Sequence, residues 1–268
     1  MSRSGDAPGL RFAILGSGST GNAAVIAAGD THILLDCGFS LTETEYRLHR
    51  LGMDIESLAA ILITHEHSDH VGGLGPVARR SGLPVWMTAG TRAAIGDHAG
   101  VLSKVRTFSP HLAFEIGDLC IEPFPVPHDA REPAQFVFGD GLHRLGFVTD
   151  VGSTTTVMEQ ALTGCDALVL ECNHDIGMLE RGNYPPSLKA RILSPHGHLD
   201  NATAARLLAR LETGRLQHLV AAHLSQRNNR PELARTALAE ALGDDPDWLD
   251  VADADIGLDW REVVPRPI

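Results

Sequence analysis

The chain has 268 residues, 43% of them hydrophobic, which is enough for a substantial core in one large domain or two small ones. Its formal net charge of −12 argues against a protein that coats nucleic acid through long-range electrostatics. No apolar run approaches the roughly 20 residues of a membrane span, and the polar stretch 1–9 carries no apolar signal segment. We therefore expect a cytoplasmic protein.

The first predicted strand, residues 10–15, is followed by the glycine turn Gly16-Ser17-Gly18-Ser19-Thr20-Gly21. This turn matches the dinucleotide pattern G-x-G-x-x-G, but a dinucleotide fold needs a helix of about three turns before the next strand. Only residues 22–29 are available, and their centre is Val25-Ile26. The sequence therefore predicts a second strand here and a third over 33–35.

The central stretch is a buried-type strand, residues 59–63, that runs into His65-Glu66-His67-Ser68-Asp69-His70. Imidazole and carboxylate together suit zinc, manganese or iron, and five such groups in six residues can bind more than one ion. A helix is predicted from His70 to Arg80, and Gly72-Gly73 leave room for close approach to whatever the histidines bind. The alternative is a solvated, acidic, histidine-rich turn.

An apolar strand that ends in a ligand-type side chain occurs four times, before Asp36, His65, Asp150 and His223. In α/β sheets, sites are built at the carboxyl ends of the strands. A lone Asp after a strand is usually a helix cap or a turn former. The four instances together favour a functional site.

The other predicted elements alternate loosely between strand and helix. Strands are predicted over 84–87, 105–108, 119–126, 136–138, 143–149 and 167–170, and helices over 42–51, 154–162, 201–211 and 232–242. Gly139-Asp140-Gly141 predicts a hairpin, and three prolines before His128 favour extended backbone there. The four cysteines show no CxxC spacing, so we expect buried free thiols.

No long linker or repeat appears, so we expect one α/β domain over residues 1–268, with two sheets packed face to face and helices outside.

The motif His65-x-His67-x-Asp69-His70, followed in order by His128, Asp150 and His223, resembles the metallo-β-lactamase superfamily. The resemblance covers nearly the whole chain and implies the αββα four-layer sandwich of that superfamily. It also implies one metal ion held by His65, His67 and His128, and a second held by Asp69, His70 and His223, with Asp150 bridging them. Asp36 would support the histidine loop. An Asp at the bridging position, where true β-lactamases place a cysteine, argues against antibiotic hydrolysis.

Within the superfamily the chain is similar to the YycJ/WalJ-like branch, related to tRNase Z and PhnP phosphodiesterases. The motifs that carry this similarity are residues 15–22, 127–130, 171–175, 197–201 and 223–229. The branch implies a metal-dependent phosphodiesterase, and within that class a DNA exonuclease. Asp200 departs from the serine expected there, and the long substrate-clamping arm of tRNase Z is absent, which argues against a tRNA substrate.

Two metal ions about 3.5 to 4 Å apart suit phosphodiester cleavage, because a bridging hydroxide can attack phosphorus while both ions stabilise the developing charge. Asp69 and Asp150 are candidates to orient that hydroxide. A pair like Glu171 and His198 forms a proton relay in tRNase Z, so we expect Glu171 to raise the pKa of His198, which then protonates the leaving oxygen directly or through Asp69. The alternative is a helix-capping loop with an incidental histidine.

Further residues are candidates to face the site or to grip a phosphate oxygen: His174, Ser225, Arg227, Asn228 and Asn229. Two other functions use the same centre: a glyoxalase II-like thioesterase or lactonase, and a metal-bearing scaffold without activity. The motifs around Glu171 and His223 favour the phosphodiesterase. The choice among Zn²⁺, Mn²⁺ and iron, the choice among DNA, RNA and a small cyclic phosphate, and the oligomeric state stay open.

Overall fold

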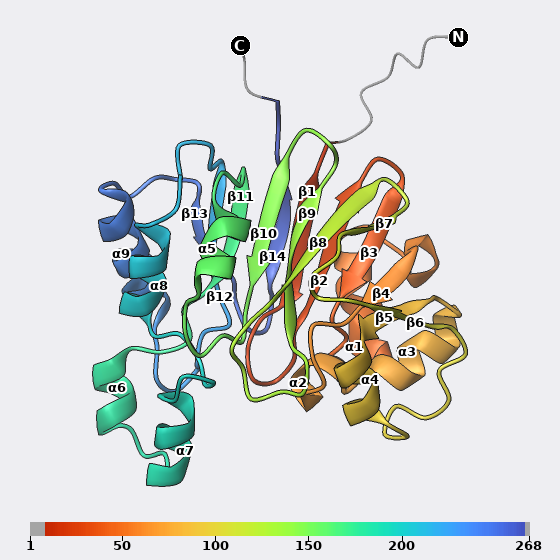
Figure 1. The fold of residues 1–268 in the computed structure, drawn as a ribbon, viewed down its shortest axis with the longest axis horizontal. Coiled ribbons are helices and arrows are strands. Elements are labelled where there is room, and N and C mark those ends of the chain that lie inside the picture. Colours follow the sequence, from red (N-terminus) through yellow and green to blue (C-terminus); the bar gives the residue numbers. More distant parts are fainter. Residues whose placement is uncertain (1–8, 266–268) are drawn as a thin grey trace.

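The computed structural model describes residues 9–265 and folds them into two seven-stranded sheets with helices on the outer faces (Figure 1). The first sheet has the order β14-β1-β2-β3-β4-β5-β6 and the second the order β13-β12-β11-β10-β9-β8-β7. This is the predicted four-layer αββα arrangement. Most of the polar N-terminal stretch lies outside the described residues.

The first sheet contains the glycine turn and the histidine loop. Its strands are β1 Arg11–Gly16, β2 Ala23–Ala28, β3 Thr31–Leu35, β4 Ala60–Leu62, β5 Val85–Thr88, β6 Val105–Phe108 and β14 Leu258–Glu262. Its outer face carries α1 Leu41–Arg50, η1 Ile55–Ser57, α2 Ser68–Val71, α3 Leu74–Ser81 and α4 Ala89–Ile95. Antiparallel pairing of β1 with β2 and of β2 with β3 confirms the predicted strands around the glycine turn.

The second sheet contains β7 Phe114–Ile116, β8 Leu119–Pro125, β9 Ala134–Gly139, β10 Arg144–Val148, β11 Ala167–Glu171, β12 His218–Ala222 and β13 Leu249–Val251. The helices of this half are α5 Thr156–Leu162, α6 Ile176–Arg181, α7 Pro186–Ile192, α8 Asn201–Leu208 and α9 Pro231–Leu242. β9 and β10 form the predicted antiparallel hairpin. β10, β11, β12 and β13 are parallel, so their carboxyl ends meet at one edge.

The strands bury both faces, because each sheet lies between the other sheet and a helix layer. On β3, Ile33 and Leu35 join the core between the sheets, while Leu34 packs in the cluster beneath the outer helices. Phe136 and Phe138 of β9 enter the central core from the opposite sheet. Side chains alternate between faces along a strand, which explains why central strands such as β2 and β4 are apolar along their whole length.

The predicted helix from His70 to Arg80 is wrong in one respect, because the structure splits it into α2 and α3. A Cβ on Gly73 would lie 1.7 Å from the Phe39 carbonyl oxygen. Gly73 also donates its N–H to the Cys37 carbonyl at 2.8 Å. The glycine pair therefore makes room for the backbone after β3, and not for whatever the histidines bind.

The acidic C-terminal stretch forms two strands that the sequence did not predict. β14 pairs antiparallel with β1, and Arg261 on it forms an ion pair with Asp250 at 2.7 Å. Helices α6 and α7 were also not predicted. Within residues 9–265, no helix has both the length and the apolar character that a membrane crossing requires.

Candidate metal centre

Three residues at strand ends adopt a left-handed backbone conformation: Asp36 after β3, Asp150 after β10 and His223 after β12, with φ of 59°, 57° and 57°. Among the described residues, no others except glycines have positive φ. This conformation costs a residue with a Cβ about 1–2 kcal/mol, and such strain clusters at functional sites. All three side chains were predicted to converge at these strand ends.

His65, His67 and His128 form the first candidate ligand group, with ligand atoms within 4.8 Å of one another. His128 Nε2 lies 3.2 Å from His67 Nδ1, close to the roughly 3.4 Å between two nitrogens bound tetrahedrally to one ion. The Gly197 carbonyl lies 3.1 Å from His128 Nδ1, and the Asp129 carbonyl lies 3.2 Å from His67 Nε2. Neighbours thus hold the outer nitrogens, leaving the inner ones for a metal.

Asp69, His70 and His223 form a second group within the same 4.8 Å limit. His70 Nδ1 donates to Asp36 at 2.8 Å, and His223 Nδ1 donates to Glu171 at 3.0 Å. Each carboxylate fixes the tautomer of its histidine, so that Nε2 is available as a ligand atom.

Asp150 lies between the two groups. Its Oδ2 is 3.0 Å from His70 Nε2, and its Oδ1 is 3.8 Å from His128 Nε2. A bridging carboxylate would occupy such a position between two ions.

The charges at this centre call for a cation. Burial alone would lower the pKa of His223, yet Asp150 and hydrogen bonds to Asp69 and Glu171 raise it to about 10. Burial lowers the pKa of His65 well below its usual value, with help from neighbouring histidines. The carboxylates of this centre thus favour a positive charge beside them, and carboxylates together with imidazoles are the donor set of a divalent metal.

The buried polar atoms give a direct test of the fit to a metal. His65 Nε2, His223 Nε2 and Asp150 Oδ2 are buried and have no hydrogen-bond partner. An unsatisfied buried polar atom is costly and needs an explanation. Metal ions at this centre would satisfy all three, so the residues fit the group.

The glycine turn after β1 supports this centre, a role that the sequence analysis did not predict. Asn22 Nδ2 lies 3.1 Å from His70 Nε2 and 3.2 Å from Asp69 Oδ2. Ser17 Oγ accepts the His223 N–H at 2.8 Å. The sequence held one signal for this role. A polar residue, Asn22, directly follows a turn of small residues, and that turn lacks the helix that a dinucleotide-binding fold requires after it.

Asp36 holds the histidine loop in place through hydrogen bonds. Besides its bond to His70, its Oδ1 accepts the Thr64 N–H at 2.9 Å and lies 3.0 Å from Thr64 Oγ1. The same carboxylate therefore orients a candidate ligand and anchors the backbone immediately before His65.

Glu171 ends β11 and is shared by two histidines. Its Oε1 accepts from His198 Nδ1 at 2.9 Å as well as from His223, and its Oε2 accepts the N–H groups of Val151 and Leu199 at 2.9 and 3.1 Å. Burial alone would raise the pKa of Glu171, but His198 and the hydrogen bonds lower it to about 2. Burial opposes protonation of His198, whereas Glu171 raises its pKa.

Side chains of the candidate centre, among them His67, Asp150 and His198, border a hollow of about 260 Å³. The sequence predicted several of its lining residues, namely His67, Asp69, Asp150, His198, His223 and Ser225. It did not predict Asp129, or the contribution of the α6–α7 segment through Tyr184, Leu188, Arg191 and Ile192. Arg191 is a single cationic residue in a short helix, and such a residue forms no sequence pattern that predicts a place in a site.

The other substrate-binding candidates are placed differently. Arg227 is exposed, with its guanidinium carbon 5.8 Å from the centre of the Tyr184 ring. Asn228 and Asn229 are buried. Asn229 Nδ2 donates to the Cys172 carbonyl at 2.7 Å and to Asn201 at 2.9 Å, so the geometry favours a part in holding the loop.

His174 is buried and lines a separate hollow of about 420 Å³, which His198 also borders. Neither of its ring nitrogens has a hydrogen-bond partner. The structure thus does not bring it into the hollow that the candidate ligands border.

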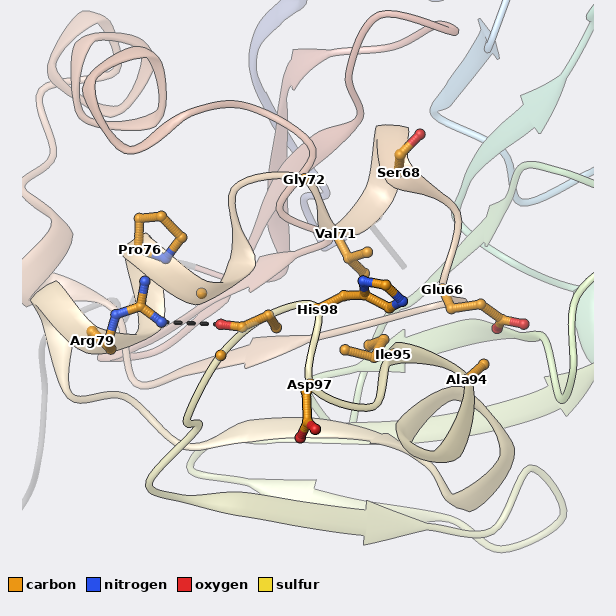
Figure 2. A pocket seen from close by; sticks show the side chains of 13 residues that line it. Glu66, Ser68, Val71, Gly72, Pro76, Arg79, Ala94, Ile95, Asp97 and His98 are labelled. Carbon is orange, nitrogen blue, oxygen red and sulfur yellow. Dashed lines mark hydrogen bonds between the residues drawn. The ribbon is translucent and has the colours of Figure 1, made fainter.

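A larger hollow of about 710 Å³ lies on the other side of the histidine loop (Figure 2). Glu66 and Ser68 border it from the loop, and the hydrogen bond from Arg79 to the Ala99 carbonyl, 3.0 Å long, spans one side. Its lining includes none of the candidate metal ligands. Size alone therefore does not identify the chemical site.

Known proteins match this chain in sequence and in fold. Residues 31–223 match the β-lactamase superfamily domain. The chain is 39% identical over 236 residues to the exodeoxyribonuclease YycJ of Bacillus anthracis, covering 87% of this chain and 89% of that protein. It is 34% identical over 259 residues to the exodeoxyribonuclease WalJ of Streptococcus pneumoniae, covering 94% and 93%.

The crystal structure of Zn²⁺-bound PqqB from Methylobacterium extorquens shares the fold, with a TM-score of 0.71, 19% identity, and coverage of 94% of this chain and 99% of that one. The fold and the histidine–carboxylate centre define a metal-dependent hydrolase. The chain belongs to the metallo-β-lactamase superfamily, in the branch that contains YycJ and WalJ.

Proposed function

We propose that this protein is a dinuclear metal-dependent phosphodiesterase that acts as an exonuclease on DNA. The observation that carries the proposal is the pair of ligand groups on either side of Asp150, which together border one hollow. The relatives named exodeoxyribonuclease, which match most of this chain, support DNA as the substrate.

In this proposal His65, His67 and His128 would hold one ion, Asp69, His70 and His223 would hold the other, and Asp150 would lie between them as a shared ligand. The donor types suit Zn²⁺ or Mn²⁺, and also iron. When bound, two such ions supply hydroxide near neutral pH and stabilise the charge that develops on the phosphate.

The remaining chemistry belongs to side chains of this chain. Asp69 borders the hollow, which supports a role in orienting the attacking group. Glu171 holds His198 through Nδ1 and favours its protonated form. His198 then donates a proton to the alkoxide oxygen that leaves phosphorus. Because Glu171 also holds His223, it links the proposed acid to a proposed metal ligand.

The test begins with the purified protein, its metal content and three assays. Bis-p-nitrophenyl phosphate and a 3′- or 5′-labelled DNA strand test phosphodiester cleavage, and S-lactoylglutathione tests thioester cleavage. We expect about two metal ions per chain, turnover of both phosphodiesters and release of mononucleotides from one DNA end. Thioester turnover by metal-loaded protein that cleaves no phosphodiester would overturn the proposal.

A further inference from the structure

Helices α6 and α7 form a projection beside the metal centre. Figure 1 shows them extending from the body of the molecule beyond α8 and α9. No residue of α7 is buried, so the helix contributes little to the core. Segment 176–193 contains one acidic and three basic side chains, although the whole chain has a net charge of −12. This projection is therefore locally basic at the edge of the site.

The segment gives the hollow an apolar and aromatic wall. Tyr184, Leu188 and Ile192 all line the hollow and are spaced four residues apart. Leu188 and Ile192 lie on one face of α7, since residues at that spacing stack along a helix. Four candidate metal ligands, His67, Asp69, Asp150 and His223, line the same hollow. A molecule bound there would meet metal-type donors and a tyrosine ring within one enclosure.

Two arginines flank this wall. The Arg227 guanidinium carbon is 5.8 Å from the Tyr184 ring centre. Arg191 also lines the hollow, and its Nε donates to Asp129 Oδ2 at 2.5 Å. Asp129 directly follows His128, so this ion pair ties the end of α7 to the metal centre. The wall is thus held in place next to the reacting groups, with cationic N–H donors at its edge.

We propose that Tyr184 stacks against a nucleobase at a single-stranded nucleic-acid end, while Arg191 and Arg227 contact phosphates of the same strand. The inference rests on the proposed function and specifies its substrate. Aromatic rings stack on any base, and arginines track the backbone without reading sequence. The hollow, at about 260 Å³, is smaller than the roughly 300–1,000 Å³ that encloses a drug-sized ligand. This size suits one nucleotide at the end of a single strand.

The test compares Tyr184→Ala and Tyr184→Phe on two single-stranded oligonucleotides that differ only in whether the terminal nucleotide carries its base. Tyr46→Ala is the matched control, because Tyr46 is the other tyrosine of the chain, is exposed and lies on α1. Tyr184→Ala should lower kcat/KM on the normal strand by about 5- to 150-fold, the scale of one stacked base. It should lower kcat/KM on the abasic strand much less, and Tyr184→Phe should retain the normal rate.

Equal losses on the normal and abasic strands would mean that Tyr184 only supports the fold, and would overturn the inference. Faster cleavage of a blunt duplex than of a single strand by the unmodified protein would overturn it as well. If the metal-loaded protein cleaves no phosphodiester, the proposed function fails. The inference about Tyr184 is then tested by measuring the binding of single-stranded DNA instead of its cleavage. Fluorescence anisotropy with a phosphorothioate single strand should show weaker binding by Tyr184→Ala than by Tyr46→Ala; equal binding would contradict it.

Discussion

Asp36, Asp150 and His223 combine burial, a ligand-type or ligand-holding side chain and a left-handed backbone. Each follows a strand that the core holds on both faces, so the surrounding packing can maintain a conformation that the isolated residue avoids. The result is rigidity at the points where the side chains must meet. Glu171 adds to it, since four hydrogen bonds fix its two oxygens.

His67→Ala should reduce phosphodiesterase activity by more than about 100-fold, because it removes an inner-facing nitrogen from the candidate metal group. Activity and metal content are measured together. His49→Ala is the matched control, since His49 is exposed on α1 and pairs with Asp54 away from the centre. Full activity of His67→Ala at unchanged metal content would exclude His67 from the centre.

His198→Ala should affect substrates according to their leaving group. A phosphodiester with an alkoxide leaving group needs a proton, and its cleavage should fall by about 10² or more. A p-nitrophenolate leaves without a proton, so its release should change little. The neighbouring exposed His196 provides the control variant His196→Ala. If both substrates lose activity equally with metals in place, His198 positions the centre and donates no proton.

At the scale of elements, the histidine loop depends on the backbone after β3. Gly38, Gly72 and Gly73 bring the two segments into contact, and the Cys37 N–H donates to the His70 carbonyl at 2.7 Å. The candidate ligands of the loop are therefore positioned by a neighbouring chain segment as well as by their own strand.

Gly73→Ala should destabilise the protein and weaken metal binding. The added Cβ would meet the Phe39 carbonyl oxygen at 1.7 Å, so the loop must shift. Such overpacking costs about 2–3 kcal/mol, which lowers Tm by about 5–10 °C in a chain of this size. Thermal unfolding and metal titration measure both effects. Gly214→Ala is the control, since a Cβ there meets no heavy atom within 4 Å; similar losses in both variants would contradict this account.

At the scale of the whole molecule, the proposed function pairs an acidic chain with a polyanionic substrate. The net charge of −12 repels DNA at long range, so attraction must come from the metal centre and from a few local cations such as Arg191 and Arg227.

The salt dependence of kcat/KM on single-stranded DNA should therefore be shallow. Each neutralised phosphate of a single strand contributes about −0.7 to the slope of log affinity against log salt, so two contacts predict a slope between about −1 and −2. The slope is measured in KCl at fixed free metal. Arg227→Ala should reduce it by about 0.7, and a slope steeper than about −4 would show many contacts instead.

We propose that residues 1–268 unfold as one domain. β1 and β14, from the two ends of the chain, are paired in the same sheet, and the candidate ligands come from both sheets. Trp86 and Trp260 lie in the first sheet and Trp248 lies beside the second. Tryptophan fluorescence and circular dichroism should then give coincident denaturant transitions at fixed free metal. Two separated transitions would indicate two independently folding units.

Much of this protein follows from local sequence alone. The apolar strands and the turns between them are short-range patterns, and the ligand-type residues follow strands whose order in the chain is visible. The cluster from His65 to His70 predicts metal binding because its donors lie within one loop. Those features predicted the four-layer fold and a candidate metal centre, whereas the pairing of Glu171 with His198 was predicted from the resemblance to tRNase Z.

Tertiary structure decided the features that depend on distant contacts. Asn22 and Ser17 contact the centre only because β1 lies in the same sheet as β3. The amide of Asn229 donates to Asn201 and to the Cys172 carbonyl, so it does not face the hollow beside the centre. The break at Gly73 requires the nearby Phe39 carbonyl. Tyr184 and Arg191 belong to short elements without strong periodicity, so only the packing of the chain reveals that they border the metal centre.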